Sequence, residues 1–502
     1  MDPLANTTQT HPNILIVTTD GHRRDALGCL HRDPVFTPHL DAFAKEGVLC
    51  TQTVTNSPLC TPARACLLTG KHPGTLTGNP PQVNMLYNWQ RLPVEEETFA
   101  KAANRAGYDT ALIGKWHVDD YEEGDHGNMW SHLTPPGPRR MGFRYWYSNG
   151  CCHDHFRLCY NDTEGQVHDL GQGWQVDHET GKAQAYLRND NGERPTEKPF
   201  CLWLNWSPPH NQTGGEAFDP EGPEFQYAAP DADMQIYRDP LLPLPHPATR
   251  AQPYRQAAPG YYGMVTNLDR AFGRLMNTLE EAGLRENTIV VYTSDHGEML
   301  GIQGRWIKDV WHEQSIGVPC ILRWPGHIPS SLRCNSVFGL VDLAPSLLAM
   351  AGVEMEAGRH GRDVSEQWLS DGQQEDESQL ICFNTGAPPA ELSKWDFPDE
   401  AGRAWRGIRT PTHTYIVVDQ RPGGTFKFYD KDRFDDAFPP EATRAAWNLK
   451  DDPQQCAPIY PGQGQDALLD QLHDLLQGKL EEIGDDFLKS WWTPQRGNNL
   501  KR

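Results

Sequence analysis

Hydrophobic positions along the chain form a series of strands that end on polar residues. The apolar, β-branched run NILIVTT at 13–19 predicts a buried parallel strand that ends at Asp20. Comparable runs predict strands that end at Lys115, just before His210 and at Asp295. Strands that alternate with helices indicate an α/β fold with a largely parallel sheet. Because ligands bind beyond the carboxyl ends of such strands, we expect these four side chains at one edge of the sheet.

Helices are predicted where apolar residues recur every three or four positions. This spacing occurs at 39–47, with Gly47 as a stop, and over 261–282, where one face is apolar. Between residues 120 and 195 the pattern gives way to glycine, aspartate, histidine and aromatic residues. That segment is predicted to form long surface loops.

The carboxyl-terminal part has a different pattern. The charged run at 370–379 indicates a boundary, and beyond it RGIRTPTHTYIVVD and TFKFYD predict antiparallel strands. A leucine-rich helix is predicted at 465–483, covering these strands. We therefore expect an α/β domain at 1–370, with a large, mixed, mostly parallel sheet between helices, and a smaller α+β subdomain at 371–502.

Composition and charge narrow the choice of partners and compartment. No run in the 502 residues approaches the ~20 apolar residues that a membrane helix needs. The net charge of −22 argues against nucleic acid and anionic membrane surfaces as partners, because the overall field repels both. The amino terminus has no apolar signal core, and the 12 cysteines have irregular spacing. We therefore expect a cytoplasmic protein.

Asp20, Asp295 and His296 are the metal-ligand candidates. Hard divalent cations prefer carboxylate oxygens, and two strand ends can bring such ligands together. Taken singly, Asp20 could cap a helix and His296 could be a packed core histidine. Their shared position at strand ends favours a metal site.

Three further residues could handle an anionic substrate. Lys115 follows an apolar strand, and Lys308 lies in GRWIKDVWHE. A lysine ammonium suits a tetrahedral oxyanion, although a lone lysine is ordinarily a surface charge. His210, after two prolines, could donate a proton to a departing oxygen near neutral pH.

The segment SPLCTPARACLLTG at 57–70 places Cys60 just before the amino end of a predicted short helix. Pro62 suits the first turn and Gly70 suits the stop. The amino end of a helix favours anions, and a low-pKa thiolate would fit there. Cys60 could equally be a small buried thiol. With the metal candidates and the lysines, the residues predict a site for a small tetrahedral anion beside a metal.

The motif CTPAR at 60–64, followed by ACLLTGKHP, resembles the signature of the type I sulfatases of the alkaline phosphatase superfamily. The resemblance extends from about residue 12 to about residue 330. It includes GYDTALIGKWH, LNWSPPH, NTIVVYTSDHGEMLG and VPCILRWPG, in the order that the family has. The carboxyl-terminal part is more loosely similar to the family's small antiparallel domain.

The resemblance implies a nucleophile and a metal centre. Cys60 would be oxidised by a maturation enzyme to Cα-formylglycine, whose hydrated aldehyde attacks sulfur. Arg64 would orient that hydrate. Asp20, Asp295, His296 and residue 60 would hold a divalent metal, calcium in the first instance and Mg²⁺ or Mn²⁺ otherwise.

The resemblance also implies roles for the remaining polar groups. Lys115 and Lys308 would neutralise the sulfate oxygens in the transition state. His117 would take a proton so that sulfate can be released, and His210 would protonate the leaving alcohol. These cations would attract an anionic substrate within the site, although the chain as a whole is acidic.

One position departs from the family's pattern. The family has a second Asp, or a Gln, directly after the first Asp, where this chain has Gly21. We expect water or a neighbouring group to fill the gap. His22 or a carboxylate from 120–195 is a candidate.

Two other functions stay open at this point. A phosphonate monoester or phosphodiester hydrolase of the same superfamily also uses formylglycine. A non-catalytic binder of sulfated glycans is the second alternative. Aromatic and polar residues at 120–195 suit sugar rings, so a sulfated saccharide is the expected substrate.

Overall fold

The computed structural model describes residues 11–76, 86, 90–119, 133–212, 225–239, 241–247, 249, 251–370, 378–384, 404–418 and 443–490. Its central feature is a ten-stranded mixed sheet in the order β11-β2-β10-β9-β1-β8-β4-β5-β6-β7. The strands are β1 (Asn13–Asp20), β2 (Val48–Cys50), β4 (Asp109–Lys115), β5 (Tyr145–Gly150), β6 (Arg157–Asn161), β7 (Val167–Gln172), β8 (Phe200–Pro209), β9 (Thr288–Ser294), β10 (Cys320–Arg323) and β11 (Leu332–Cys334). A two-stranded ribbon pairs β3 (Thr53–Val54) with β12 (Phe338–Gly339).

The five middle strands, β9, β1, β8, β4 and β5, run parallel. Every residue of β1 is buried, as expected for an apolar strand that is covered on both faces. Antiparallel pairing is found toward the two edges, at β10 and at β6–β7. The predicted α/β fold with a mostly parallel, mixed sheet is confirmed.

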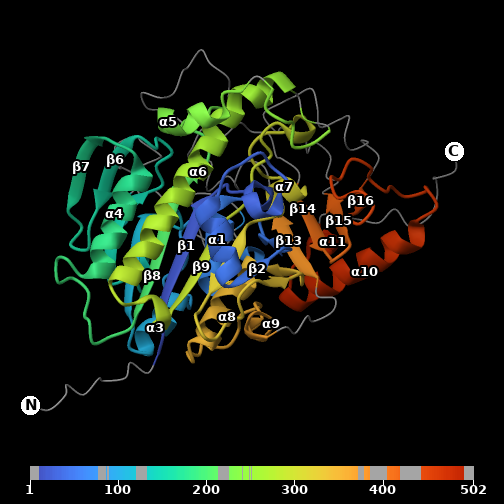
Figure 1. The fold of residues 1–502 in the computed structure, drawn as a ribbon. Helices are drawn as coiled ribbons and strands as arrows, with labels where there is room; N and C mark the ends of the chain where they lie inside the picture. Colours follow the sequence, from blue (N-terminus) through green and yellow to red (C-terminus); the bar gives the residue numbers. More distant parts are fainter. Residues whose placement is uncertain are drawn as a thin grey trace, which may run out of the picture.

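Helices cover both faces of this sheet (Figure 1). One face packs against α1, α4 and α6, and the other packs against α2, α3, α8 and α9. The helices are α1 (Pro38–Glu46), α2 (Cys60–Thr69), α3 (Phe99–Arg105), α4 (Gln175–Arg188), α5 (Asp231–Met234), α6 (Ala251–Glu281), α7 (Glu313–Ile316), α8 (Leu343–Met350), α9 (Ser365–Leu369), α10 (Asp466–Ile483) and α11 (Phe487–Ser490). The predicted helix at 261–282 thus begins ten residues earlier and continues through Pro259.

The prediction of long surface loops over 120–195 was wrong for the described part of that segment. It contains β5, β6, β7 and α4, which extend the large sheet and cover it. β5 ends in Asn-Gly, β6 ends in Asn and β7 contains Asp and Gly, which are residues of low strand propensity, and β7 is a mostly exposed edge strand. Pairing with a neighbouring strand, which a local pattern does not report, stabilises them.

The carboxyl-terminal part forms a separate four-stranded antiparallel sheet in the order β13-β14-β15-β16. Its strands are β13 (Gln379–Phe383), β14 (Trp405–Arg409), β15 (His413–Val418) and β16 (Arg444–Asn448). The predicted leucine-rich helix is α10, which packs on one face of this sheet. It lies at the right of the view in Figure 1. TFKFYD lies outside the described residues, and the boundary at 370 borders the undescribed residues 371–377.

The other face of the small sheet packs against the loop that follows β9. Trp405 and Ile416 share a buried cluster with Ile302, Val310 and Trp311. Packing of this kind fixes the loop that carries Lys308, so the small sheet supports the edge at which the predicted site lies.

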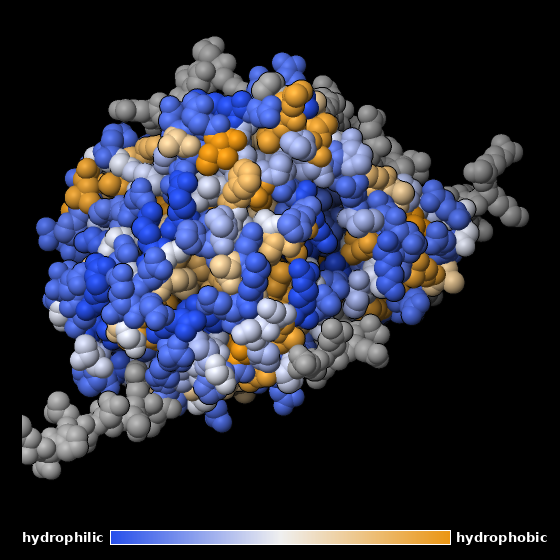
Figure 2. Space-filling view, viewed as in Figure 1, coloured by the Kyte–Doolittle hydropathy of each residue, from blue (hydrophilic) through white to orange (hydrophobic). Residues whose placement is uncertain are grey.

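The view in Figure 2 shows a face covered largely by hydrophilic residues, with apolar residues in small separate groups. Among the described residues, no helix combines the length and the apolarity that crossing a membrane requires.

A buried ion triad joins the two sheets. Glu313 at the start of α7 accepts from Arg24 at 2.6 Å and from Arg409 at 2.8 and 3.1 Å. Burial alone would raise the pKa of Glu313, but Arg409 and then Arg24 outweigh it and hold that pKa well below its usual value. The charge on Glu313 therefore stabilises the fold at neutral pH.

Glu313→Gln is expected to lower the free energy of unfolding by about 3–5 kcal/mol at pH 7, because it leaves two buried arginines uncompensated. The carboxylate's contribution is full above the usual glutamate pKa and is lost as the pH falls through the lower folded-state pKa. Urea unfolding at several pH values measures this. Asp169→Asn, which breaks the exposed pair with Arg157, is the control and should cost no more than about 1 kcal/mol. Equal costs for both variants would contradict the prediction.

Candidate active site

The polar residues predicted at strand ends do meet at one edge of the large sheet. Asp20 and Lys115 are the last residues of β1 and β4, and His210 and Asp295 directly follow β8 and β9. These strands are neighbours in the order β9-β1-β8-β4 and run parallel. Their carboxyl ends therefore lie together.

Cys60 lies at the centre of the acidic part of this edge. It is the first residue of α2, rather than the residue before it, and Gly70 ends the helix in the left-handed conformation. The Cys60 Sγ lies 3.2 Å from His296 Nε2 and 3.8 Å from Asp20 Oδ1. The amino end of α2 thus points at the predicted metal ligands.

Ligand atoms from Asp20, Cys60, Asp295 and His296 all lie within 4.8 Å of one another, and all four residues are buried. Burial alone would raise the pKa of Asp20, but Lys115 and a hydrogen bond from His296 hold it well below its usual value. Two carboxylates and an imidazole suit a hard divalent cation. The residues present therefore fit the predicted metal.

Arg64 binds Asp295, one of the predicted metal ligands, and the end of β4. It lies one turn along α2 from Cys60, and its Nε donates to Asp295 Oδ2 at 3.0 Å. Its Nη1 donates to the carbonyl oxygen of Lys115 at 3.4 Å. Arg64 thus connects the helix that carries Cys60 to both strand ends.

Two buried lysines supply positive charge beside Cys60. Lys115 Nζ contacts Asp20 Oδ2, and Lys308 Nζ lies 2.5 Å from His210 Nε2. Burial alone would lower both lysine pKa values. Asp20 outweighs it for Lys115, and Cys60 with Asp20 outweighs it for Lys308, so that both pKa values are raised. Both side chains are cations at neutral pH.

His117 and His210, by contrast, are neutral. Burial, and then Lys115, hold the pKa of His117 well below its usual value. Burial, His153 and Lys308 do the same for His210. The His210 ring carries its proton on Nδ1, which donates to the Asn211 carbonyl at 2.9 Å, so Nε2 accepts from Lys308. A neutral His117 can accept a proton, and His210 Nε2 can pass one on from Lys308.

His153 was not among the predicted site residues. Its Nε2 lies 2.9 Å from Lys115 Nζ and 3.8 Å from Asp20 Oδ2, and its ring stacks on His210. It belongs to CCHDH, directly after β5, in the segment predicted to be loop. If the sequence pattern had predicted β5 as a strand, His153 would have been expected at the same sheet edge as the other candidates.

The backbone of Gly21 lies in the left-handed region. It has a φ of +83°, and its N–H donates to Asp295 Oδ1 at 3.3 Å. A Cβ at this position would lie 3.8 Å from His296 Cε1, an ordinary contact distance. His22 cannot replace the missing ligand, contrary to one expectation, because its ring bonds to Tyr292 and to the carbonyl of Ala26. Within the described residues 133–195, the imidazole of His153 reaches Asp20.

Gly21→Asp is expected to tighten calcium binding by about tenfold, because it adds a charged oxygen ligand beside His296. The positive φ should cost about 1–2 kcal/mol of stability in the metal-free protein. Gly21→Ala is the matched control, since it carries the same backbone cost without a ligand. Competition with a chelating dye measures the affinity, and urea unfolding measures the stability. If both variants bind calcium alike, the added carboxylate does not reach the ion.

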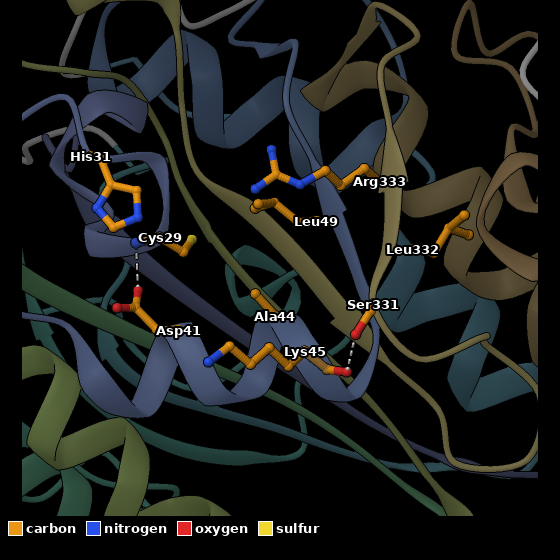
Figure 3. A pocket seen from close by; sticks show the side chains of 9 residues that line it. All are labelled: Cys29, His31, Asp41, Ala44, Lys45, Leu49, Ser331, Leu332 and Arg333. Carbon is orange, nitrogen blue, oxygen red and sulfur yellow. Dashed lines mark hydrogen bonds between the residues drawn. The ribbon is translucent and has the colours of Figure 1, made fainter.

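A cavity of about 330 Å³ lies elsewhere, between α1 and the edge strand β11 (Figure 3). Figure 3 shows Lys45 from α1 and Arg333 from β11 on opposite sides of it. It is lined by Cys29, His31, Asp41, Ala44, Lys45, Leu49, Ser331, Leu332 and Arg333. None of these is a predicted site residue, so the cavity is separate from the chemistry described above.

Known proteins resemble this chain over most of its length. The family model described as Sulfatase matches residues 12–353. An ulvan-active sulfatase from Formosa agariphila is 32% identical over 488 residues, which cover 95% of this chain and 83% of the relative. An endo-4-O-sulfatase from Bacteroides thetaiotaomicron is 32% identical over 366 residues, 68% of this chain and 70% of the relative.

The fold has close counterparts among solved structures. One from Bacteroides thetaiotaomicron, described with the metabolism of multiple glycosaminoglycans, superposes with a TM-score of 0.78 at 26% identity. The match covers 95% of this chain and 97% of the other.

Proposed function

Since this chain belongs to the type I sulfatase family, we propose that it releases sulfate from a sulfated carbohydrate through a nucleophile derived from Cys60. The chain is a sulfuric ester hydrolase, as its family and its named relatives are. The observation that carries the proposal is the position of Cys60, with its Sγ 3.2 Å from His296 and two buried lysines nearby.

Two groups that the family uses would complete this site. Formylglycine made from Cys60 would supply a hydroxyl oxygen as nucleophile. Asp20, Asp295, His296 and residue 60 would hold a divalent cation, which we propose to be calcium, with Mg²⁺ and Mn²⁺ as the alternatives. When bound, this cation would lower the pKa of the nucleophilic hydroxyl and offset charge on the sulfate.

The lysines account for anion binding by an acidic protein. Lys115 and Lys308 are charged and buried, and each contacts one of the stacked histidines, His153 and His210 respectively. Their ammonium groups can donate to sulfate oxygens, and this electrostatic stabilisation strengthens as charge develops. A net charge of −22 therefore does not exclude an anionic substrate.

The histidines would move the protons. His210 Nε2 faces Lys308, and the negative charge of a bound sulfate ester raises the pKa of the imidazole. The proton that His210 Nε2 receives from Lys308 can then pass to the leaving oxygen, which leaves His210 neutral and Lys308 as a neutral amine. His117, which is neutral and buried, can take a proton when sulfate is released. Arg64 would orient residue 60 from the next turn of α2.

Two kinds of partner follow from the proposal. The first is a small sulfated substrate. Relatives named for ulvan and for 4-O-sulfate support a saccharide. The second is a formylglycine-generating enzyme that acts on Cys60.

The test is sulfate release by protein produced with such a maturation enzyme. A panel of sulfated mono- and oligosaccharides should include at least one substrate, and an aryl sulfate should be turned over faster than an aryl phosphodiester. Preference for the phosphodiester would favour a phosphodiester or phosphonate monoester hydrolase. Binding of a sulfated glycan with no release of sulfate would favour a non-catalytic binder.

A further inference from the structure

His153 occupies a position between the two halves of the proposed machinery. It is 3% exposed and lies in the connection between β5 and β6. The proposed steps use Lys115 on one side of it and His210 on the other, but assign it no role. It makes specific contacts with both Lys115 and His210.

The first contact fixes a lysine. His153 Nε2 lies 2.9 Å from Lys115 Nζ, and an ammonium group can only donate, so Nε2 accepts. Lys115 also contacts Asp20 Oδ2. Because two acceptors bind it, the position of the Lys115 ammonium is defined by both contacts.

The second contact fixes the general acid. The rings of His153 and His210 are stacked, with centroids 3.9 Å apart and planes inclined by 19°. His210 also has its Nδ1 on the Asn211 carbonyl, while His155 Nε2 binds the carbonyl of His210 at 2.8 Å. The His153 ring therefore limits the tilt of the imidazole whose Nε2 would protonate the leaving group.

These contacts form a continuous series: Lys115, His153, His210 and Lys308. The outer members would bind sulfate oxygens, and His210 would reach the oxygen that leaves. Their relative placement matters, since a misplacement of about 1 Å can cost about 10²-fold in rate.

We propose that His153 is a positioning residue that aligns Lys115 through its Nε2 and His210 through its ring. The proposal rests on the proposed function, because both partners act there on a sulfate ester. The Nε2 contact would affect Lys115 and the ring contact would affect His210, so a substitution that removes one contact should disturb only its partner.

A second metal site at Asp20, His153 and His210 is the competing explanation, because their ligand atoms also lie within 4.8 Å of one another. The contacts disfavour it. His153 Nε2 faces Lys115 and His210 Nε2 faces Lys308, so a cation there would have to displace two ammonium groups.

Two substitutions separate the contacts. His153→Gln keeps an acceptor near Nε2 and removes the ring, whereas His153→Phe keeps a flat ring and removes the acceptor. We expect His153→Gln to retain turnover of an activated aryl sulfate within about threefold and to lose about 10–10²-fold on a sugar sulfate with a poor leaving group. We expect His153→Phe to lose about 10–10²-fold on both substrates, because Lys115 acts on sulfate whatever the leaving group.

The controls are His178→Gln and His178→Phe. His178 lies on α4, bonds to Tyr147 and has no contact with the site residues named above. Both variants should keep native activity on both substrates, and urea unfolding of all four should confirm that each is folded. Identical behaviour of the two His153 variants, or a reversed pattern, would overturn the proposal.

If the proposed function is wrong, the native matured protein releases no sulfate from either substrate. If only the His153 proposal is wrong, the native enzyme is active and the two His153 variants do not show the expected difference. Extra divalent metal bound by native protein, at a second site that His153→Phe removes, would also overturn the positioning role.

Discussion

Replacing Cys60 by alanine or serine is expected to abolish sulfate release, with a loss of at least about 10⁴-fold in kcat. Residue 60 is the proposed source of the nucleophile and lies at the amino end of α2, beside His296 and Asp20. The fold should persist, because the substitution removes one small group from a packed helix end.

Cys66→Ala is the matched control for this prediction. Cys66 lies on the same helix and is equally buried, but its Sγ faces Asn56 Oδ1 at 3.7 Å, away from the metal ligands. Activity should stay within a few-fold of native. Mass spectrometry should find an aldehyde or its hydrate at residue 60 in matured protein, and an intact thiol in protein made without the maturation enzyme. Full activity with an intact thiol would rule out the mechanism.

Replacing His210 by alanine is expected to reduce turnover of sugar sulfates by about 10²–10⁴-fold, the usual range for a general acid. An activated aryl sulfate should be affected much less, because its leaving group departs without a proton. The geometry supports this role, since His210 Nε2 receives a hydrogen bond from Lys308 and Nδ1 is held by Asn211.

Leaving-group dependence is the measurement that decides this prediction. Rates for a series of sulfate esters with alcohols of different acidity should fall more steeply for His210→Ala than for the native enzyme. His246→Ala is a control on another buried histidine, one that bonds to the carbonyl of Gln454. An equal loss across the whole series would remove His210 from the role of acid.

Elements with a strong local pattern could be predicted from the sequence. The apolar runs of β1, β8 and β9 and the amphipathic stripe of α6 are visible over short windows, because burial on both faces or on one face sets the residue pattern directly. The positions of Asp20 and Lys115 at strand ends follow from the same runs. The segments that lacked such a pattern, β5 to β7 and α4, were missed, and their residues are ordered by neighbours distant in the chain.

What the sequence by itself determined about this protein is therefore its local elements and the list of groups available for chemistry: a cysteine before Thr-Pro, an arginine, two acids, two lysines and three histidines. Only the tertiary structure decided which of the 20 histidines meet, that His153 lies between Lys115 and His210, and that Gly21 has a left-handed backbone. The physical reason is the strand order. β9, β1, β8, β4 and β5 are neighbours in space although they lie far apart in the chain, and their order depends on pairing and packing across the whole sheet rather than on any short run of residues.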